Sequence, residues 1–413
     1  MHLILPKEIV ILSAARTPVG RFDGSLSGLD AVDLGAIAIE AAVSRAGIDA
    51  TAVDTVNMGI VVSSGYGIAP AKAAATQAGL PQTIHSRSIE TVCGSAMDAI
   101  ALVIESLMAG TTTLAVAGGM ESRSNAQYLL RPRFRRDTEH YKKGGRLKVK
   151  RGGAYRFVLS ENIDEQLRAT EIVDPTSYDG LFCPDDKKFM RQYALEYAAR
   201  QGYTAELING FAAESHRKTR EAAAQGWFHD EIAPAGAVKD DDLAPDEVLQ
   251  QELIANPDDM ASAYNSSTPA DGAAALVLTT GDEAARIGAK PIARVIGFAR
   301  VDSPACDFLA APVAASDELR EAIRAAGQPD DVGVVEANEA FGIQLPLFDQ
   351  AFAGTALNVH GGAIALGHPL GAAGARITTT LLYAMKRYGH RRGLATICYG
   401  GGGGYALAVE ASD

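Results

Sequence analysis

The first third of the chain alternates short apolar runs with longer amphipathic stretches. The apolar runs have the length of β-strands, whereas the stretches between them repeat apolar residues at helical spacing. This pattern predicts strands at 8–13, 55–62, 84–90 and 112–117, and helices at 32–46, 71–78 and 95–108. Strands that alternate with helices are typical of an α/β domain with a mainly parallel sheet.

A similar order of elements recurs after residue 290. Here the pattern predicts strands at 292–298, 332–336 and 394–398, and helices at 317–326, 339–352 and 371–387. The repeated order indicates a duplicated α/β unit. We assign residues 1–124 and 258–285 to the N-terminal half and residues 286–413 to the C-terminal half.

Residues 125–257 interrupt this alternation and are predicted to form an inserted loop domain. They contain charged loops and two long helical stretches, at 185–200 and 205–225. Within them, the segment 131–156 carries eleven Lys or Arg residues against only two acidic residues. This basic segment stands out because the chain as a whole is acidic.

Composition and charge exclude several classes of protein and of binding partner. The chain has 413 residues, of which 47% are hydrophobic and 21% charged, the balance of a globular protein. Its formal net charge of −12 disfavours nucleic acid as a general partner, because phosphates would be repelled over most of the surface. No apolar run reaches the roughly 20 residues of a membrane span, so we expect no membrane partner.

The cysteines and the two ends of the chain indicate the cellular compartment in which we expect the protein. The four cysteines, at 93, 183, 306 and 398, lack the spacing of a disulfide framework or a metal site. This favours a reducing compartment and no bound metal. Because neither end carries a recognisable targeting signal, we expect the protein in the cytoplasm.

The segment ETVCGSAM at 90–97 places Cys93 where a predicted strand turns into a helix. A cysteine there lies at the positive end of the helix dipole, and its own amide can help to form an anion-binding pocket. This position is expected to lower the pKa of the thiol from about 8.5 and to raise the thiolate fraction at neutral pH. A buried structural cysteine is the alternative at this point.

Two histidines, His360 and His368, lie in the glycine-rich stretch 358–374. Glycine lets the main chain approach a ligand, and imidazole titrates near neutrality, so a base and a substrate contact are both available here. A single loop histidine is more often an ordinary surface residue. Gly367 and Pro369 restrict the backbone around His368, which favours a functional role for it.

Two further segments place reactive or polar groups at predicted strand ends. Cys398 closes a strand and is followed by five glycines, at 400–404. Such a run costs backbone entropy on folding, and the close approach of a ligand is the reason we infer for it. Asn338 and Glu339 follow another strand, at the edge where sites in open α/β sheets gather.

Together these segments resemble the thiolase family. The resemblance rests on six segments in register, which are SAARTP at 13–18, CGSA at 93–96, GGMES at 118–122, NEAF at 338–341, GGAIALGHP at 361–369 and Cys398 with its glycines. It implies a thiolase fold of class α/β, with duplicated halves in five α/β/α/β/α layers and an inserted loop domain. It also implies a homodimer or homotetramer and coenzyme A (CoA) as substrate, with no bound cofactor.

The resemblance also implies how each catalytic residue acts. Cys93 would attack the carbonyl and carry an acyl group, after His368 has taken the thiol proton. Cys398 would exchange a proton with the Cα of the second acyl group. One oxyanion hole would use His368 and a water held by Asn338, and the other the amides of Cys93 and Gly400.

Three more residues are expected to bind substrate. By its place in the family pattern, Ser267 would touch the pantetheine arm of CoA, and Met190 would line the acyl pocket. Trp227 stands where relatives often carry a basic residue over the adenine. It would stack on the adenine or, as the alternative, serve in core or edge packing.

The sequence departs from the family pattern at the entrance of the acyl pocket. Short-chain thiolases usually have His-Met-Gly there, whereas this chain has KFMR at 188–191. The basic segment 131–156 also lies in a longer loop than usual. It would face CoA phosphates or an acidic acyl group, or else form a solvated arm that pairs with acidic surface or packs in an oligomer.

We therefore expect thiolytic cleavage of 3-ketoacyl-CoA through an acyl-enzyme on Cys93. An acetoacetyl-CoA-forming enzyme is the second interpretation. A decarboxylating ketoacyl synthase would lack a second catalytic cysteine in the place of Cys398. A non-catalytic thiolase-like protein that binds lipid or a partner would not need all of Cys93, His368, Asn338 and Cys398.

Overall fold

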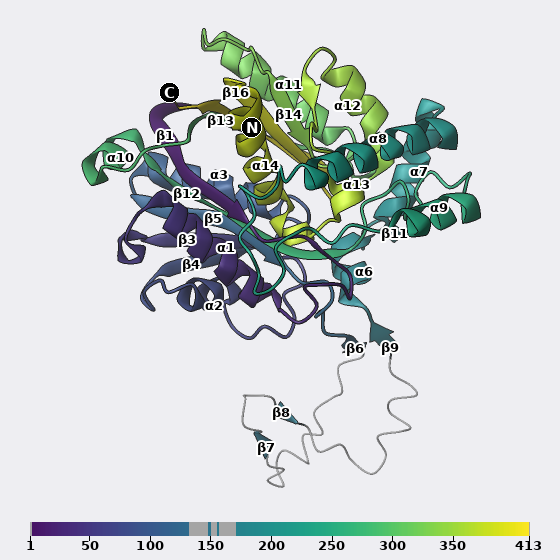
Figure 1. Cartoon of the computed structure of the whole chain (residues 1–413), viewed down its shortest axis with the longest axis horizontal. Helices are drawn as coiled ribbons and strands as arrows, with labels where there is room; N and C mark the ends of the chain where they lie inside the picture. Colours follow the sequence, from purple (N-terminus) through teal and green to yellow (C-terminus); the bar gives the residue numbers. More distant parts are fainter. Residues whose placement is uncertain (1, 132–147, 150–154, 157–170, 413) are drawn as a thin grey trace.

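The computed structural model describes residues 2–131, 148–149, 155–156 and 171–412 (Figure 1). Most of the basic segment 131–156 therefore lies outside the described residues, and both interpretations of it stay predictions. Two short strands of this segment, β7 and β8, are described, at Lys148–Val149 and Tyr155–Arg156.

The N-terminal half contains five main strands. They are β1 (His2–Arg16), β3 (Thr55–Gly59), β4 (His85–Ile89), β5 (Leu114–Glu121) and β12 (Ala270–Thr280). Their order in the sheet is β4-β3-β5-β12-β1. Strand β3 is parallel to β4 and β5, whereas β12 is antiparallel to β5 and β1. The short β2 (Gly20–Arg21) pairs with β12.

The C-terminal half repeats this arrangement. Its strands are β13 (Ala293–Asp302), β14 (Val334–Ala337), β15 (Ala356–Leu357), β16 (Arg392–Tyr399) and β17 (Gly403–Ala411). Their order, β15-β14-β16-β17-β13, and their strand directions match the first half position by position. Antiparallel pairing of β1 with β13 joins the half-sheets. The order of strands therefore confirms the predicted duplication.

Helices cover both half-sheets and fill the space between them (Figure 1). The outer face of the N-terminal half carries α1 (Ala31–Ala46) and α2 (Pro70–Gln77). The outer face of the C-terminal half carries α11 (Ala311–Ala325) and α12 (Leu345–Ala351). Between the half-sheets lie α3 (Ser95–Ala109) and α14 (Ala373–Tyr388). These five layers confirm the expected α/β/α/β/α fold.

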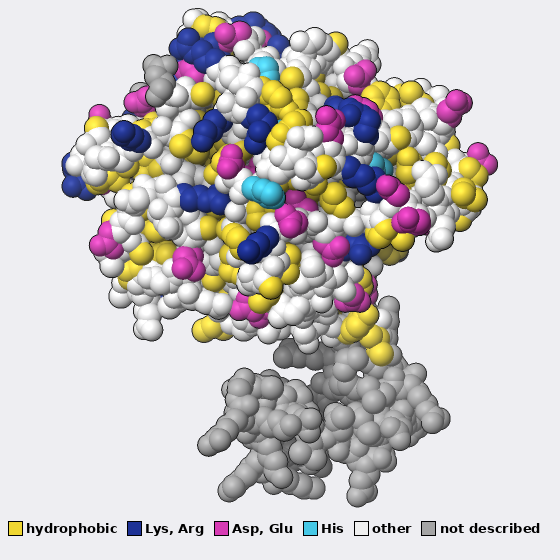
Figure 2. All heavy atoms as spheres, viewed as in Figure 1, with side chains coloured by type: hydrophobic (Ala, Val, Ile, Leu, Met, Phe, Trp, Pro, Cys, Tyr) yellow, Lys and Arg dark blue, Asp and Glu magenta, His cyan; other side chains and the backbone are white. Residues whose placement is uncertain are grey.

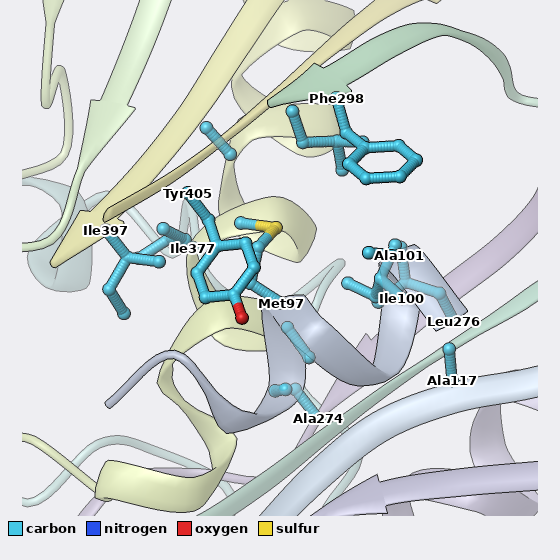
Figure 3. Packing of buried hydrophobic residues seen from close by; sticks show 14 of the residues in the cluster. Met97, Ile100, Ala101, Ala117, Ala274, Leu276, Phe298, Ile377, Ile397 and Tyr405 are labelled. Carbon is cyan, nitrogen blue, oxygen red and sulfur yellow. The ribbon is translucent and has the colours of Figure 1, made fainter. Parts of the chain in front are cut away.

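The central layer forms much of the hydrophobic core. Met97 and Ile100 of α3, Ile377 of α14 and Tyr405 of β17 are all at most 2% exposed and lie close together (Figure 3). The helical stretch Val92–Ala109 is long and apolar enough to cross a membrane by composition. Its place between the half-sheets accounts for that composition, because both of its sides face apolar neighbours.

The described part of the region between β5 and β12 contains four helices and several short strands. Its helices are α6 (Pro175–Leu181), α7 (Met190–Gln201), α8 (Ala205–Ala224) and α9 (Asp246–Ala255). Its strands pair as β6 (Leu129–Arg131) with β9 (Glu171–Val173) and β10 (Phe182–Cys183) with β11 (Lys188–Phe189). Two shorter helices lie elsewhere, α10 (Gly281–Ile287) and α13 (Ala363–Leu366). The boundaries at 125 and 257 stay predictions.

Two predicted helices are shorter in the structure. The helix expected at 339–352 is α12 alone, preceded by a 3-10 turn at Gly342–Gln344, because the polar residues after β14 form a loop. Pro346 then lies in the first turn of α12, where its missing N–H costs nothing. The helix expected at 185–200 begins only at Met190, since the residues before it form the β10–β11 hairpin.

Charged side chains are mixed over the face seen in Figure 2. Lys and Arg lie among Asp and Glu there, and the described residues of this face form no continuous basic stripe. A nucleic-acid site needs such a stripe. The expectation that nucleic acid is not a partner stays a prediction.

Candidate active site

Cys93 lies on a strained turn between β4 and α3. Val92, directly before it, has φ of 49°, which is rare for a β-branched residue and costs on the order of 1–3 kcal/mol. The Ser95 side chain holds this turn, because its Oγ accepts from the Thr91 amide at 2.9 Å and donates to the Val92 carbonyl at 2.6 Å. This strained turn places Cys93 at the wall of a cavity.

His368 lies on the loop between α13 and α14, in the opposite half of the molecule. Its amide donates to the carbonyl of Thr268 at 2.9 Å, which ties the loop to the segment before β12. Gly367 has φ of 98°, a conformation that favours glycine. Both ring nitrogens of His368 are buried without a hydrogen-bond partner in the described part of the chain. The imidazole is therefore free to exchange a proton.

Cys93 and His368 line the same open cavity, whose volume is about 310 Å³. This size is typical of small-molecule sites. Gly400, Ser267 and Met190 also line the cavity. The structure thus brings together five of the eight site residues named from the sequence.

Cys398 and Asn338 lie behind the cavity wall, and both are fully buried. Cys398 lies near the end of β16 and close enough to Cys93 to contribute to the raised pKa of the Cys93 thiol. Burial raises the pKa of Cys398 itself to about 12. A thiol with this pKa is a proton donor at neutral pH.

The amide of Asn338 is oriented by a buried arginine. Nη2 of Arg376 donates to Oδ1 of Asn338 at 3.2 Å, and Nδ2 of Asn338 has no partner among the described residues. Beneath them is Glu336, whose pKa burial raises to about 8. Because Oδ1 is occupied, Nδ2 is the group of Asn338 that can hold a water or substrate oxygen.

The pKa values of the two central groups move in opposite directions. Burial raises the pKa of the Cys93 thiol well above its usual range, although Arg123 and the amides of Cys93 and Gly400 act to lower it. Burial also lowers the pKa of His368 to about 3, with further lowering by Arg376 and Arg123. Desolvation disfavours the charged form of each group, so both are neutral at pH 7.

The expected low pKa of Cys93 was therefore wrong for the empty site. The cysteine does lie at the start of α3, but it is 7% exposed. A helix dipole contributes about 1 kcal/mol, which is less than the cost of ionising a thiol away from water. The Cys93 side chain is therefore a neutral thiol at pH 7.

Gly400 and Met190 meet at the cavity wall. A Cβ added at Gly400 would lie 3.1 Å from the Met190 sulfur, so a side chain there would require Met190 to shift by a few tenths of an ångström. The amide of Gly400 points to the Cys93 thiol. Ser267 lies across the cavity, where its hydroxyl donates to the Ala340 carbonyl at 2.9 Å.

The structure does not bring Trp227 to this cavity. Its ring packs 5.3 Å from the His360 ring and lies under the guanidinium of Arg387 at 5.5 Å. Tyr388 contacts the same cluster. These contacts favour the packing interpretation of Trp227, and its role over an adenine stays a prediction.

Sequence reasoning missed two charged residues near the cavity. Arg123 lines the cavity and is buried. Glu121 accepts hydrogen bonds from the amides of Val61, Val62 and Gly371 at 2.9–3.2 Å, and so ties the His368 loop to the N-terminal half. Both residues belong to or follow the GGMES motif, and a charged pair at the end of a buried strand was the available signal.

Comparisons with known proteins agree with this geometry. Residues 9–282 match the model of the thiolase N-terminal domain, and residues 289–411 match that of the thiolase C-terminal domain. The chain is 36% identical to an acetyl-CoA acetyltransferase of Escherichia coli, over 98% of this chain and 99% of that protein. It is 37% identical to another from Cupriavidus necator, over the same shares. The solved structure of a thiolase from Ascaris suum in complex with coenzyme A matches with a TM-score of 0.83 at 30% identity, covering 98% of this chain and all of that one.

Proposed function

Because this chain belongs to the thiolase family, we propose that it cleaves 3-ketoacyl-CoA by thiolysis through an acyl-enzyme on Cys93. The observation that carries this proposal is the pairing of a neutral thiol with a neutral imidazole in one cavity. The Cys93 and Gly400 amides point to the same sulfur. A nucleophile, a base and oxyanion donors are thus available together.

In the first half-reaction, His368 accepts the thiol proton as Cys93 attacks the C3 carbonyl of the substrate. The C2–C3 bond then breaks. The leaving acetyl-CoA enolate takes a proton from Cys398, and the shortened acyl group stays on Cys93. Nδ2 of Asn338, through a water, stabilises the enolate oxygen together with His368.

In the second half-reaction, the Cys398 thiolate takes the proton of an incoming CoA thiol. The CoA thiolate attacks the acyl-enzyme, and the amides of Cys93 and Gly400 stabilise the tetrahedral oxyanion. As the intermediate collapses, Cys93 leaves as a thiolate and recovers its proton from His368. The cycle returns every group to its starting protonation state.

Formation of acetoacetyl-CoA from two acetyl-CoA molecules is the second candidate. It uses the same groups in reverse, and the relatives in E. coli and C. necator are named acetyl-CoA acetyltransferases. We favour cleavage because of Phe189, Met190 and Arg191, which line the cavity. They stand where short-chain enzymes usually have His-Met-Gly.

The test uses acetoacetyl-CoA and 3-ketooctanoyl-CoA, each with free CoA and wild-type enzyme or Cys93→Ala. We expect loss of ketoacyl-enolate absorbance only with wild type, and an acyl adduct on Cys93 by mass spectrometry when CoA is left out. The ratio of the two rates separates a short-chain enzyme from a broad one. Absence of both turnover and adduct would contradict the proposal and favour a non-catalytic binding protein.

A further inference from the structure

Two arginines line the cavity, and no Asp or Glu does so among the described residues. Arg191, in the first turn of α7, is half exposed and pairs with Asp259 at 2.6 Å. Arg123 differs, because it is only 3% exposed. A buried cation at the wall of an otherwise apolar site needs a partner to offset its desolvation.

The guanidinium of Arg123 uses little of its hydrogen-bonding capacity within the protein. Nη2 donates to the Thr176 carbonyl at 2.5 Å, while Nε is buried without an acceptor in the described residues. A guanidinium carries five N–H donors in a planar fork. Buried donors are normally paired with an acceptor. The described residues supply no acceptor for Nε of Arg123, so a bound molecule is the expected partner.

The nearest carboxylates are already bound to other donors. Glu121 accepts from three backbone amides, and Asp271 accepts from both the amide and the hydroxyl of Ser124. Asp174 accepts from residues of the first turn of α6. Within the described chain, none of them forms an ion pair with Arg123.

Arg123 lies at the reacting end of the cavity. Its charge acts on both Cys93 and His368 and lowers the pKa of each. A Cβ added at Gly180, next to the apolar wall of Leu181, would lie 3.8 Å from Nη1 of Arg123. The phosphates of CoA are separated from its thioester by the whole pantetheine arm. The anion that reaches Arg123 must therefore belong to the acyl group.

We propose that Arg123 binds a carboxylate carried by the acyl group, so that the substrate is a CoA monothioester of a 3-ketodicarboxylic acid. The inference rests on the proposed function and specifies its substrate class. The planar guanidinium matches a carboxylate in a bidentate pair. An uncharged acyl group would leave the buried Nε–H of Arg123 without an acceptor, and the site would bind it less well.

The test compares matched pairs of substrates. The CoA monothioesters of 3-ketohexanedioic and 3-ketooctanedioic acids are set against 3-ketohexanoyl-CoA and 3-ketooctanoyl-CoA, with kcat and KM measured for each. We expect wild-type enzyme to prefer one diacid over its neutral partner by on the order of 100-fold in kcat/KM.

Variants of Arg123 then test whether this preference depends on its buried guanidinium. Arg123→Met should lower kcat/KM with the diacid by on the order of 100-fold more than with the neutral substrate. Arg123→Lys keeps the positive charge but not the planar fork. Its kcat/KM with the diacid should lie between those of wild-type enzyme and Arg123→Met. Arg217→Met is the matched control, because Arg217 is exposed on α8 and pairs with Glu214 and Glu221.

The outcomes distinguish failure of the carboxylate site from failure of the proposed function. Preference of wild-type enzyme for the neutral substrates would overturn the carboxylate site and leave thiolysis intact. An equal fall of both rates in Arg123→Met would overturn it as well, since Arg123 would then act on the Cys93 thiol. Turnover of no substrate, with no adduct on Cys93, would overturn the proposed function itself.

Discussion

At the scale of a single residue, two opposing influences act on the ionisation of the Cys93 thiol. The start of α3 and the nearby amides favour its thiolate, whereas burial favours its thiol, and burial is the larger cause. The same burial keeps His368 uncharged. The pair is thus set for proton transfer when substrate arrives, rather than ionised in advance.

This balance predicts slow alkylation of Cys93 in the free enzyme. Iodoacetamide reacts with the thiolate, and a pKa above the usual range should make the rate rise about tenfold per pH unit through about pH 9, with no plateau. The rate is measured by mass spectrometry of the Cys93 peptide, with free cysteine as reference. A plateau in the acidic range would instead show a preformed thiolate and imidazolium pair.

Asn338 gives a second prediction at this scale. Arg376 leaves Nδ2 as its available donor, so Asn338→Ala should lower kcat by on the order of 10²- to 10³-fold with little change in KM. Asn338→Asp keeps the shape of the side chain but lacks the N–H donor, so its kcat should fall by a similar factor. Steady-state kinetics that show full activity in Asn338→Asp would exclude the proposed water-holding role.

At the scale of elements, close packing of backbones sets the distance between the two catalytic loops. A Cβ added at Gly119 of β5 would lie 2.0 Å from the Gly371 carbonyl oxygen, on the loop that carries His368. Glu121 at the end of the same strand accepts from the Gly371 amide at 2.9 Å. Strand β5 thus positions a loop that is 250 residues away in sequence.

Gly119→Ala should therefore destabilise the protein and reduce its activity together. Forcing a methyl group against backbone costs about 1–3 kcal/mol or more, and relief of the clash would move His368. Gly210→Ala is the control, because Gly210 lies on an exposed part of α8 with open space at its Cβ. It should stabilise by about 0.5–1 kcal/mol.

Thermal and urea unfolding of both variants measure these changes, alongside thiolysis rates. Unchanged stability in Gly119→Ala would mean that the loop can move away at no cost. In that case the strand would not be what positions His368.

At the scale of the whole molecule, the duplication places Cys93 in one half and His368 in the other. Cys93 follows β4, and His368 precedes α14, the helix of the second half that corresponds to α3. The half-sheets end at β4 and β15. Strand β15 has only two residues, whereas β4 has five with mostly exposed side chains. An unpaired edge of this length favours pairing with another chain.

We accordingly predict a dimer or tetramer in solution that buries β4. Light scattering coupled to size exclusion should give two or four times the chain mass of 43.2 kDa. The mass should hold on dilution through the micromolar range. A monomer at every concentration would exclude the assembly proposed from the family, and the edge of β4 would then need another cover.

The sequence by itself determined the fold class and the chemical groups of the site. Alternating apolar patterns encode local elements, so the duplication was visible from their order. The motifs around Cys93, His368 and Cys398 indicated the candidate reacting groups, because glycines and strand ends are typical of close approach to a ligand.

Only the tertiary structure decided how those groups behave. The raised pKa of Cys93, the packing of Trp227 against His360 and the unpaired fork of Arg123 all depend on contacts between residues far apart in the chain. Burial is a property of the whole packed molecule, and no local pattern specifies which polar group will lack a partner.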